Sequence, residues 1–238
     1  MKKILVLVLP LLSFLAFEKN VQSTDLFFDA ADAFLKMYVS NGKVDYGGIS
    51  KNPEALHSIL TMAEAINVNP ANAETYKAFW INAYNLAVIK GIVDNYPLKS
   101  PLDKKGFFDV TQYKLGGTAI TLNDIENKKL RAQFGDARFH FVLVCGAKGC
   151  PPLIAQAYRP KTLDGQLQQQ TRRAVNNSSF IKVTGGKVAL SEIFKWYRED
   201  FLKEAKTEIG FLNVYRKNKI AEGTKITYYP YNWQLNSL

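Results

Sequence analysis

The chain contains few of the residues that usually build metal and redox centres. Its 238 residues include only two cysteines and two histidines. A structural zinc site takes four such ligands at short, characteristic spacings, which this set does not offer, so we expect no bound metal and no cofactor. Cys145 and Cys150 are also further apart in sequence than the cysteines of a CxxC redox motif.

Long apolar runs are scarce as well. The longest, Ile4–Phe17, follows two lysines at the N-terminus and is shorter than the roughly 20 residues that cross a membrane. This pattern is typical of a secretory signal, with a plausible cleavage site after Ser23. We therefore predict a signal peptide at residues 1–23 and an exported, periplasmic or extracellular domain at residues 24–238. No stable membrane insertion is expected after cleavage.

Acidic residues are fewer than basic ones, which leaves a formal net charge of +10. Such a balance can indicate binding to nucleic acids or anionic surfaces. The basic residues are scattered, however, and no long basic run is interleaved with aromatic residues. We interpret them as solvated surface charge and expect no nucleic-acid partner.

Internal repeats, low-complexity tracts and a regular βαβ alternation are also absent from the sequence. Apolar periodicity predicts helices at 25–39, 53–66, 74–95, 162–176 and 207–217. Gly-Gly pairs predict two hairpins, at 113–120 and 180–190, each followed directly by a capped helix, and Pro230 predicts an edge strand near the C-terminus. The expected fold class is α+β: one domain with a central buried helix packed on a small, mostly antiparallel sheet and several surrounding helices.

The predicted helix at 74–95 is apolar on nearly all sides, so it should be the central one. Asn82 and Asn85 lie three positions apart and therefore share a face of this helix. Buried amides need hydrogen-bond partners. The two side chains are thus expected either to bond neighbouring loops or to face a polar site.

A strand is predicted at 138–145, because polar and apolar residues alternate there. Arg138 and His140 lie on the same face of this strand. We expect them to line a polar cleft floored by the central helix, together with Asn82 and Asn85.

Three uses of the two cysteines remain open: a disulfide, a pair of free structural thiols, and a catalytic thiol. An oxidising compartment favours a disulfide between Cys145 and Cys150. The alternation places Cys145 on the face opposite His140, whereas Cys150 follows a glycine-rich turn that could return it to His140. A catalytic Cys150 would also need an orienting group, for which Asn82 and Glu126 are candidates.

Five segments, in order, resemble the signature blocks of the domain-of-unknown-function family numbered 547. They are KAFWINAYN, ITLNDIE, RFHFVLVCGAKGCPPL, LSEIFKWYREDF and YYPYNWQLN, and the resemblance covers about residues 44–236. The family has exported bacterial members, which this chain resembles, and plant members in which the domain follows a coiled coil. The resemblance implies no established activity. Plant-type members can carry another residue at the position of Cys150, which argues against a catalytic thiol common to the family.

We expect an exported domain that binds a peptide, a glycan or a small ligand in a polar cleft. The alternative is a hydrolase of cysteine-peptidase or transglutaminase-like type, and the sequence leaves open whether the protein is an enzyme. The ligand-binding candidates are Asn82, Asn85, Arg138 and His140, and the catalytic candidates are Cys150, His140 and Glu126.

Overall fold

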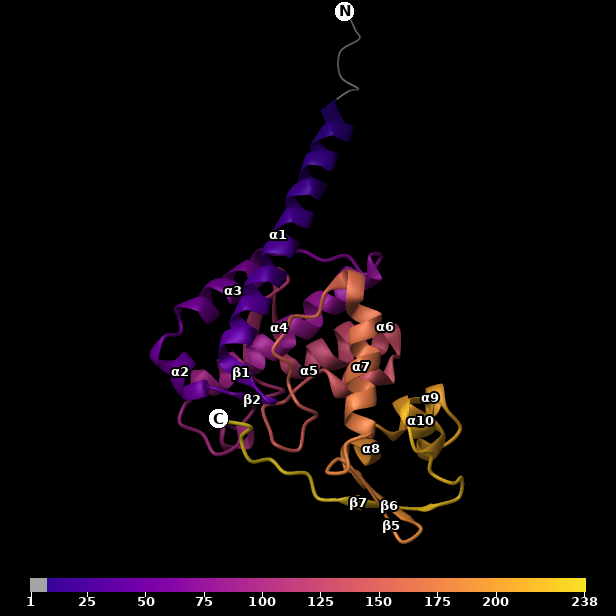
Figure 1. Ribbon diagram of the computed structural model, residues 1–238. Helices are drawn as coiled ribbons and strands as arrows, with labels where there is room; N and C mark the ends of the chain where they lie inside the picture. The colour runs from indigo at the N-terminus through magenta and orange to yellow at the C-terminus, as the bar shows by residue number, and fades with distance from the viewer. Residues whose placement is uncertain (1–7) are drawn as a thin grey trace, which may run out of the picture.

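The computed structural model describes residues 8–238, with side chains from residue 23 onward. The predicted signal peptide at residues 1–23 thus lies almost entirely outside the residues with described side chains. The α-helices are α1 Val8–Tyr38, α2 Tyr46–Lys51, α3 Glu54–Ala65, α4 Ala73–Val93, α5 Leu122–Asp124, α6 Ala132–Phe134, α7 Leu163–Val175, α8 Ile193–Trp196, α9 Arg198–Glu204 and α10 Glu208–Tyr215. The strands are β1 Val39–Ser40, β2 Lys43–Val44, β3 Gln112–Leu115, β4 Thr118–Thr121, β5 Ile181–Thr184, β6 Lys187–Ser191 and β7 Lys225–Tyr229. The fold is α+β, as predicted (Figure 1).

Helix α4 is the central helix of the fold (Figure 1). Its side chains are buried along nearly its whole length, and the Asn72 side chain caps its start by accepting a hydrogen bond from the Thr75 amide. The antiparallel hairpin β3–β4 packs against it: at Gly116, with φ +61°, a Cβ atom would lie only 2.8 Å from the Trp80 ring. The predicted packing of a central helix on a small antiparallel sheet is therefore confirmed.

A second sheet, formed by β5, β6 and β7, lies at the C-terminal end of α7 (Figure 1). Strands β5 and β6 form the predicted antiparallel hairpin, and β7 joins β6 in parallel at the edge. Pro230 directly follows β7, so this edge strand is also confirmed. Helices α8, α9 and α10 contribute buried side chains to the apolar cluster beside this sheet.

The core consists of two apolar clusters, one around α4 and one beside the β5–β6–β7 sheet. The segment that links them is η3, a 3₁₀ helix at Ala137–Phe141. Phe139 packs in the first cluster and Phe141 in the second. The predicted strand at 138–145 is therefore wrong: the alternation reflects two apolar clusters on different sides of a 3₁₀ turn. The Asp136 side chain starts this turn by accepting a hydrogen bond from the Arg138 amide.

Helix α2 forms although Gly47 and Gly48 directly follow its first residue, Tyr46. Both glycines lie inside this helix. The Asp45 carboxylate accepts a hydrogen bond from the Gly48 amide at 2.8 Å and so provides an N-cap. The cap outweighs the poor helix propensity of the two glycines.

The helix after β4 contains a π-helical turn. It begins with α5, continues as the π-helix η2 over Ile125–Arg131 and ends with α6. Thr121 caps its start, so the predicted cap after the hairpin is present, and Gly135, with φ +60°, ends the helix. Turns of π-helix inside α-helices occur frequently at functional sites.

The C-terminal segment crosses the loop that follows η3. Backbone hydrogen bonds join Lys148 to Gln234 and Gly149 to Asn232. The segment then reaches β2, where the Val44 amide donates to the Asn236 carbonyl (Figure 1). This path brings residues near the C-terminus against the cysteine-containing loop.

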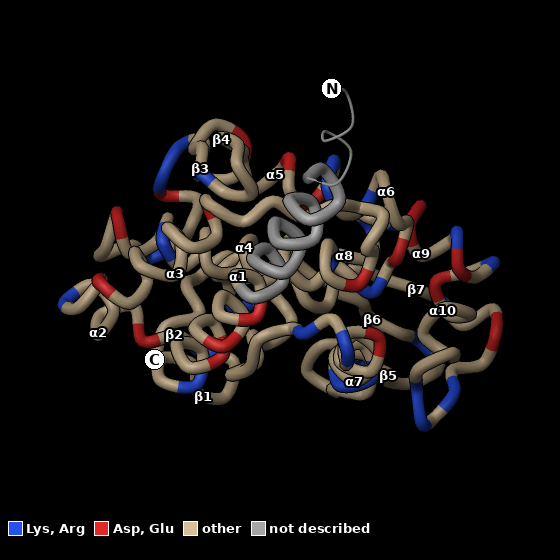
Figure 2. The backbone as a smooth tube through the Cα atoms, turned by 90° about the horizontal axis from the view of Figure 1, so that it is seen from above, with Lys and Arg blue, Asp and Glu red and all other residues tan. Residues whose placement is uncertain are grey.

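Basic positions are distributed around the molecule and alternate with acidic ones (Figure 2). Several form surface ion pairs, such as Lys90 with Asp94 and Lys128 with Asp124. This distribution supports the interpretation as solvated surface charge. Within residues 8–238, no helix has both the length and the apolar character needed to cross a membrane.

Candidate functional site

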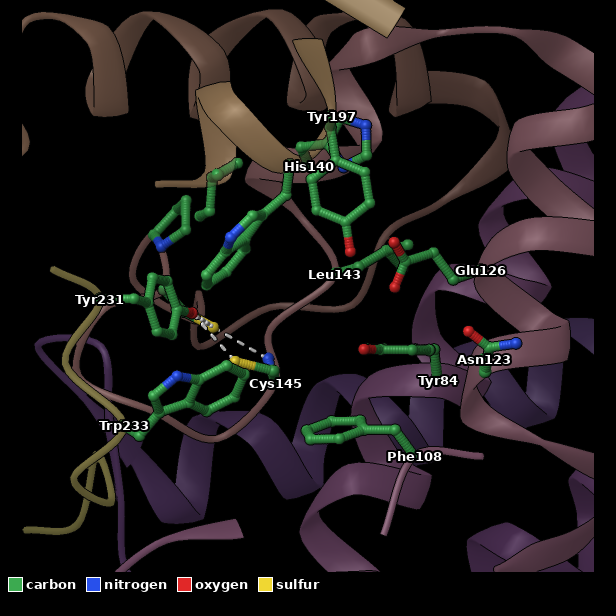
Figure 3. Close-up of a pocket in the computed structure, with 14 residues that line it drawn as sticks. Tyr84, Phe108, Asn123, Glu126, His140, Leu143, Cys145, Tyr197, Tyr231 and Trp233 are labelled. Carbon is green, nitrogen blue, oxygen red and sulfur yellow. Dashed lines mark hydrogen bonds between the residues drawn. The ribbon is translucent and has the colours of Figure 1, made fainter. Parts of the chain in front are cut away.

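A cavity of about 270 Å³ lies where the two apolar clusters meet (Figure 3). Six aromatic residues from distant parts of the chain line it: Tyr84, Phe108, Trp196, Tyr197, Tyr231 and Trp233. Its other lining residues are Asn123, Glu126, His140, Leu143, Cys145, Cys150, Pro151 and Ile193. We call this site the aromatic cavity.

The aromatic rings form a connected wall on one side of the aromatic cavity. The ring centroids of Tyr231 and Trp233 lie 4.7 Å apart, and those of Trp196 and Tyr231 lie 5.1 Å apart. Phe108 extends this wall, with its centroid 6.2 Å from that of Trp233. Trp196 is 47% exposed, so it forms part of the rim.

Glu126 and two tyrosine hydroxyls provide polarity on the other side. The Tyr197 hydroxyl and the Glu126 carboxylate point toward each other, with the Tyr84 hydroxyl nearby (Figure 3). Burial, together with the charge of Glu126 and a hydrogen bond to it, raises the pKa of Tyr197 above its usual range. Burial and the same charge raise the pKa of Tyr84. Both tyrosines are therefore neutral at physiological pH.

The Tyr84 hydroxyl is the most informative polar group. Tyr84 is only 3% exposed, and its hydroxyl points into the aromatic cavity (Figure 3). Among the described residues, none forms a hydrogen bond with it. The hydroxyl itself opens onto the cavity, so it is available to form a hydrogen bond with a molecule bound there.

The two thiols contact a shared partner. The Tyr231 hydroxyl lies 3.0 Å from the Cys145 sulfur and 2.8 Å from the Cys150 sulfur. The Cys145 amide also donates a hydrogen bond to the Cys150 sulfur at 3.0 Å. Both cysteines are free thiols in the structure, so the expected disulfide is not formed in it.

The two thiols differ in acidity. Burial acts to raise the pKa of Cys150, but hydrogen bonds from the Cys145 thiol, Tyr231 and backbone amides lower it below its ordinary value. Burial and the neighbouring Cys150 raise the pKa of Cys145. Cys150 is therefore the more acidic thiol.

His140 lines the aromatic cavity, but its ring is engaged on the side away from the cysteines. Its Nε2 atom lies 2.9 Å from an Asp200 carboxylate oxygen, to which Nε2–H donates. The ring stacks on Tyr197 at 3.9 Å between centroids. Asp200 also accepts from Arg131 at 2.6 Å and Lys203 at 3.1 Å. Within the described contacts, no hydrogen bond joins His140 to either thiol.

The four residues predicted to form one polar cleft are not brought together. Arg138 lies in a surface ion-pair group with Asp136 and Asp164. These ion pairs hold the Arg138 side chain outside the aromatic cavity. Of the four predicted residues, only His140 lines the cavity. The four residues therefore do not line one common cleft in the structure.

Asn82 and Asn85 bond neighbouring loops, which was one of the two expectations for them. Asn82 donates to the Tyr158 carbonyl and accepts from the Tyr158 amide, at 2.7 and 3.0 Å. Asn85 donates to the Val142 carbonyl and accepts from the Val144 amide, at 3.0 and 2.9 Å. The two amides hold loops against α4, and Asn85 thereby positions the segment that leads to Cys145.

Sequence patterns did not identify the aromatic residues as a site. Trp196, Tyr197, Tyr231 and Trp233 lie in two short aromatic segments, FKWY and YYPYNW, where an aromatic core is the simplest interpretation. Tyr84 and Phe108 lie outside these segments. No group of three or more His, Cys, Asp or Glu residues in the described part of the chain is placed to hold a metal ion.

Comparison with protein families gives a match at residues 68–175 to the family described as "Protein of unknown function, DUF547". The match supports the family assignment implied by the sequence segments. It includes α4, the π-helix, η3 and both cysteines, and ends before Trp196, Tyr231 and Trp233. No curated protein and no solved structure matches the chain.

Proposed function

We propose that this protein is an exported domain that binds a small ligand in the aromatic cavity. The observation that carries the proposal is the Tyr84 hydroxyl, which opens onto the cavity from an otherwise buried side chain and has no described hydrogen-bond partner. Ligand sites typically combine aromatic walls with a few converging polar groups, and this cavity has both.

The size of the cavity favours a small molecule over a peptide or glycan chain. Its volume of about 270 Å³ is just below the range for ligand pockets, roughly 300–1,000 Å³. A larger molecule could place only one end group inside.

A screen of small molecules by thermal shift and tryptophan fluorescence tests the proposal, because Trp196 and Trp233 report on the cavity. A true ligand raises the melting temperature of the wild type and loses affinity in Tyr84→Phe. Tyr113→Phe is the matched control, since Tyr113 is also buried with an unpaired hydroxyl but does not line this cavity.

Asn123→Trp should block the rim of the cavity and abolish binding, because Asn123 is an exposed lining residue. The proposal is wrong if every stabilising compound acts equally on the wild type and on Asn123→Trp. It is also wrong if no compound in a diverse library binds.

A thiol hydrolase is the second candidate, favoured by the lowered pKa of Cys150 inside the cavity. A thiolate nucleophile also needs a base, and His140 is bonded to Asp200 instead. If this candidate is correct, the reduced protein hydrolyses activated esters or peptides, and Cys150→Ser abolishes turnover. Equal background rates in both proteins exclude it.

A further inference from the structure

The charge of the aromatic cavity differs from that of the protein. The sequence has 31 Lys and Arg residues against 21 Asp and Glu, yet no described Lys or Arg lines this cavity. Glu126 is its one carboxylate. A basic protein therefore presents an acidic, aromatic cavity.

Glu126 has no ion pair among the described residues. Arg131, on the same helix, lies 4.8 Å from the centroid of the Tyr197 ring, but its guanidinium bonds Asp200 and Asn127. Arg131 does not line the cavity. The negative charge of Glu126 is thus available to a bound molecule.

Aromatic faces add to this preference for positive charge. A cation within about 6 Å of a ring centroid is attracted by the electron density of the ring face, most strongly for tryptophan. Figure 3 shows Trp233 and Tyr231 on one side of the opening, Tyr84 and Glu126 on the other, Phe108 below and Tyr197 above. An enclosure of rings with one carboxylate is suited to an alkylated ammonium group.

An anionic ligand would meet Glu126 without a basic partner in the lining. A neutral sugar would leave the charge of Glu126 without a counter-ion. On the side of α4 and η2, the Tyr84 hydroxyl and the Glu126 carboxylate face the cavity.

We propose that the ligand of the aromatic cavity is a small organic cation with an alkylated ammonium group, held by the aromatic rings and Glu126. The Tyr84 hydroxyl is placed to bond a polar atom of the same molecule. This inference rests on the proposed ligand-binding function and specifies its ligand class.

Calorimetry with two isosteric probes tests the ligand class. Choline carries a trimethylammonium group, and 3,3-dimethylbutan-1-ol has the same shape with a neutral carbon in place of nitrogen. We expect choline to bind the full chain at least about tenfold more tightly, because only choline forms a desolvated cation–π contact.

Variants test whether the preference for choline arises from Glu126 in the aromatic cavity. Glu126→Gln should weaken choline about tenfold and leave the neutral probe within about twofold. Glu74→Gln is the control, because it removes an equal charge from an exposed position on α4 that does not line the cavity. The comparison of the two probes in the wild type holds even if Glu126→Gln fails to fold.

Equal affinity for both probes, or tighter binding of the neutral one, overturns the cation assignment. If Asn123→Trp abolishes binding of the neutral probe, the cavity is still a small-ligand site, and the proposed function holds with a neutral ligand. Failure of choline and tetramethylammonium to bind at millimolar concentration also overturns the cation assignment, while the library screen decides on the proposed function separately.

Discussion

The hydroxyl group of Tyr231 lies 2.8 Å from the sulfur of Cys150, although 81 residues separate them in sequence. The same hydroxyl contacts Cys145, so one tyrosine connects the C-terminal segment to both thiols of the aromatic cavity. This contact lowers the pKa of both thiols. Cys150 additionally receives hydrogen bonds from the Cys145 thiol and amide, which make it the more acidic of the two and lead to the first prediction.

Cys150 should react faster than Cys145 with iodoacetamide in the reduced native protein near neutral pH. Hydrogen bonds lower the pKa of Cys150, whereas burial raises that of Cys145. Tyr231→Phe removes one donor and should slow the alkylation of Cys150 about three- to tenfold, measured by mass spectrometry of the labelled peptides. Tyr229→Phe, whose hydroxyl bonds the Phe180 carbonyl instead, should leave the rate unchanged. Faster labelling of Cys145 contradicts this interpretation.

Mild oxidation should join Cys145 and Cys150 in a disulfide within one chain. Both sulfurs contact one hydroxyl, and the Cys145 amide contacts the Cys150 sulfur, so little movement is needed. Intact mass after diamide treatment should fall by the mass of two hydrogens and return with dithiothreitol. The disulfide closes a short loop, so the gain in unfolding free energy should stay below about 3 kcal/mol. Exclusive formation of dimers linked between chains would show that the thiols are held apart.

Asp200→Asn should lower the unfolding free energy by about 3–5 kcal/mol at neutral pH, because it leaves the half-buried Arg131 guanidinium and the buried His140 ring without their carboxylate. The hydrogen bond from His140, together with Arg131 and Lys203, holds the pKa of Asp200 well below its usual range despite burial. A lowered folded-state pKa means that this stabilisation is complete above the unfolded pKa of about 3.9. It is lost as the pH falls below that value.

Urea unfolding from pH 7 down to pH 2 measures both effects. The difference between wild type and Asp200→Asn should shrink as the solution becomes acidic. Asp164→Asn is the control, since the Asp164 side chain is 75% exposed in its ion pair and should change stability by at most about 0.5 kcal/mol. A difference that is independent of pH would refute the electrostatic explanation.

Asn85→Ala should destabilise the fold by about 2–4 kcal/mol, measured by urea unfolding. The substitution leaves the buried Val142 carbonyl and Val144 amide without partners. Asn218→Ala, at an exposed position, should stay within about 0.5 kcal/mol of the wild type. Because Asn85 holds the chain next to Cys145, the variant should also expose both thiols to labelling. Unchanged stability would instead favour the direct ligand-binding role first considered for this amide.

Local patterns predicted much of the fold. The apolar character of α4, the Gly-Gly turns of both hairpins and the cap of the helix after β4 all act over a few residues, and the structure contains each of them. The same patterns failed where an alternation had a different cause. Phe139 and Phe141 alternate because two apolar clusters lie on different sides of a 3₁₀ turn.

Only part of the candidate site could be predicted from the sequence. His140, Cys145, Cys150 and Glu126 were recognisable as reactive residue types, and all four line the aromatic cavity. Asn82, Asn85 and Arg138 were also polar residues in suggestive places, but their hydrogen bonds and ion pairs lie elsewhere. Residue type alone does not tell whether a polar group is already paired inside the protein.

By itself, the sequence determined the α+β class, the buried central helix, the hairpins and the presence of two thiols near one histidine, because periodicity, caps and turns depend on neighbouring residues. Only the tertiary structure decided that Tyr231 and Trp233 from the C-terminal segment face Tyr84 and Glu126, and that His140 bonds Asp200. These contacts join residues far apart in the chain. They arise from the packing of two apolar clusters, which no local pattern encodes.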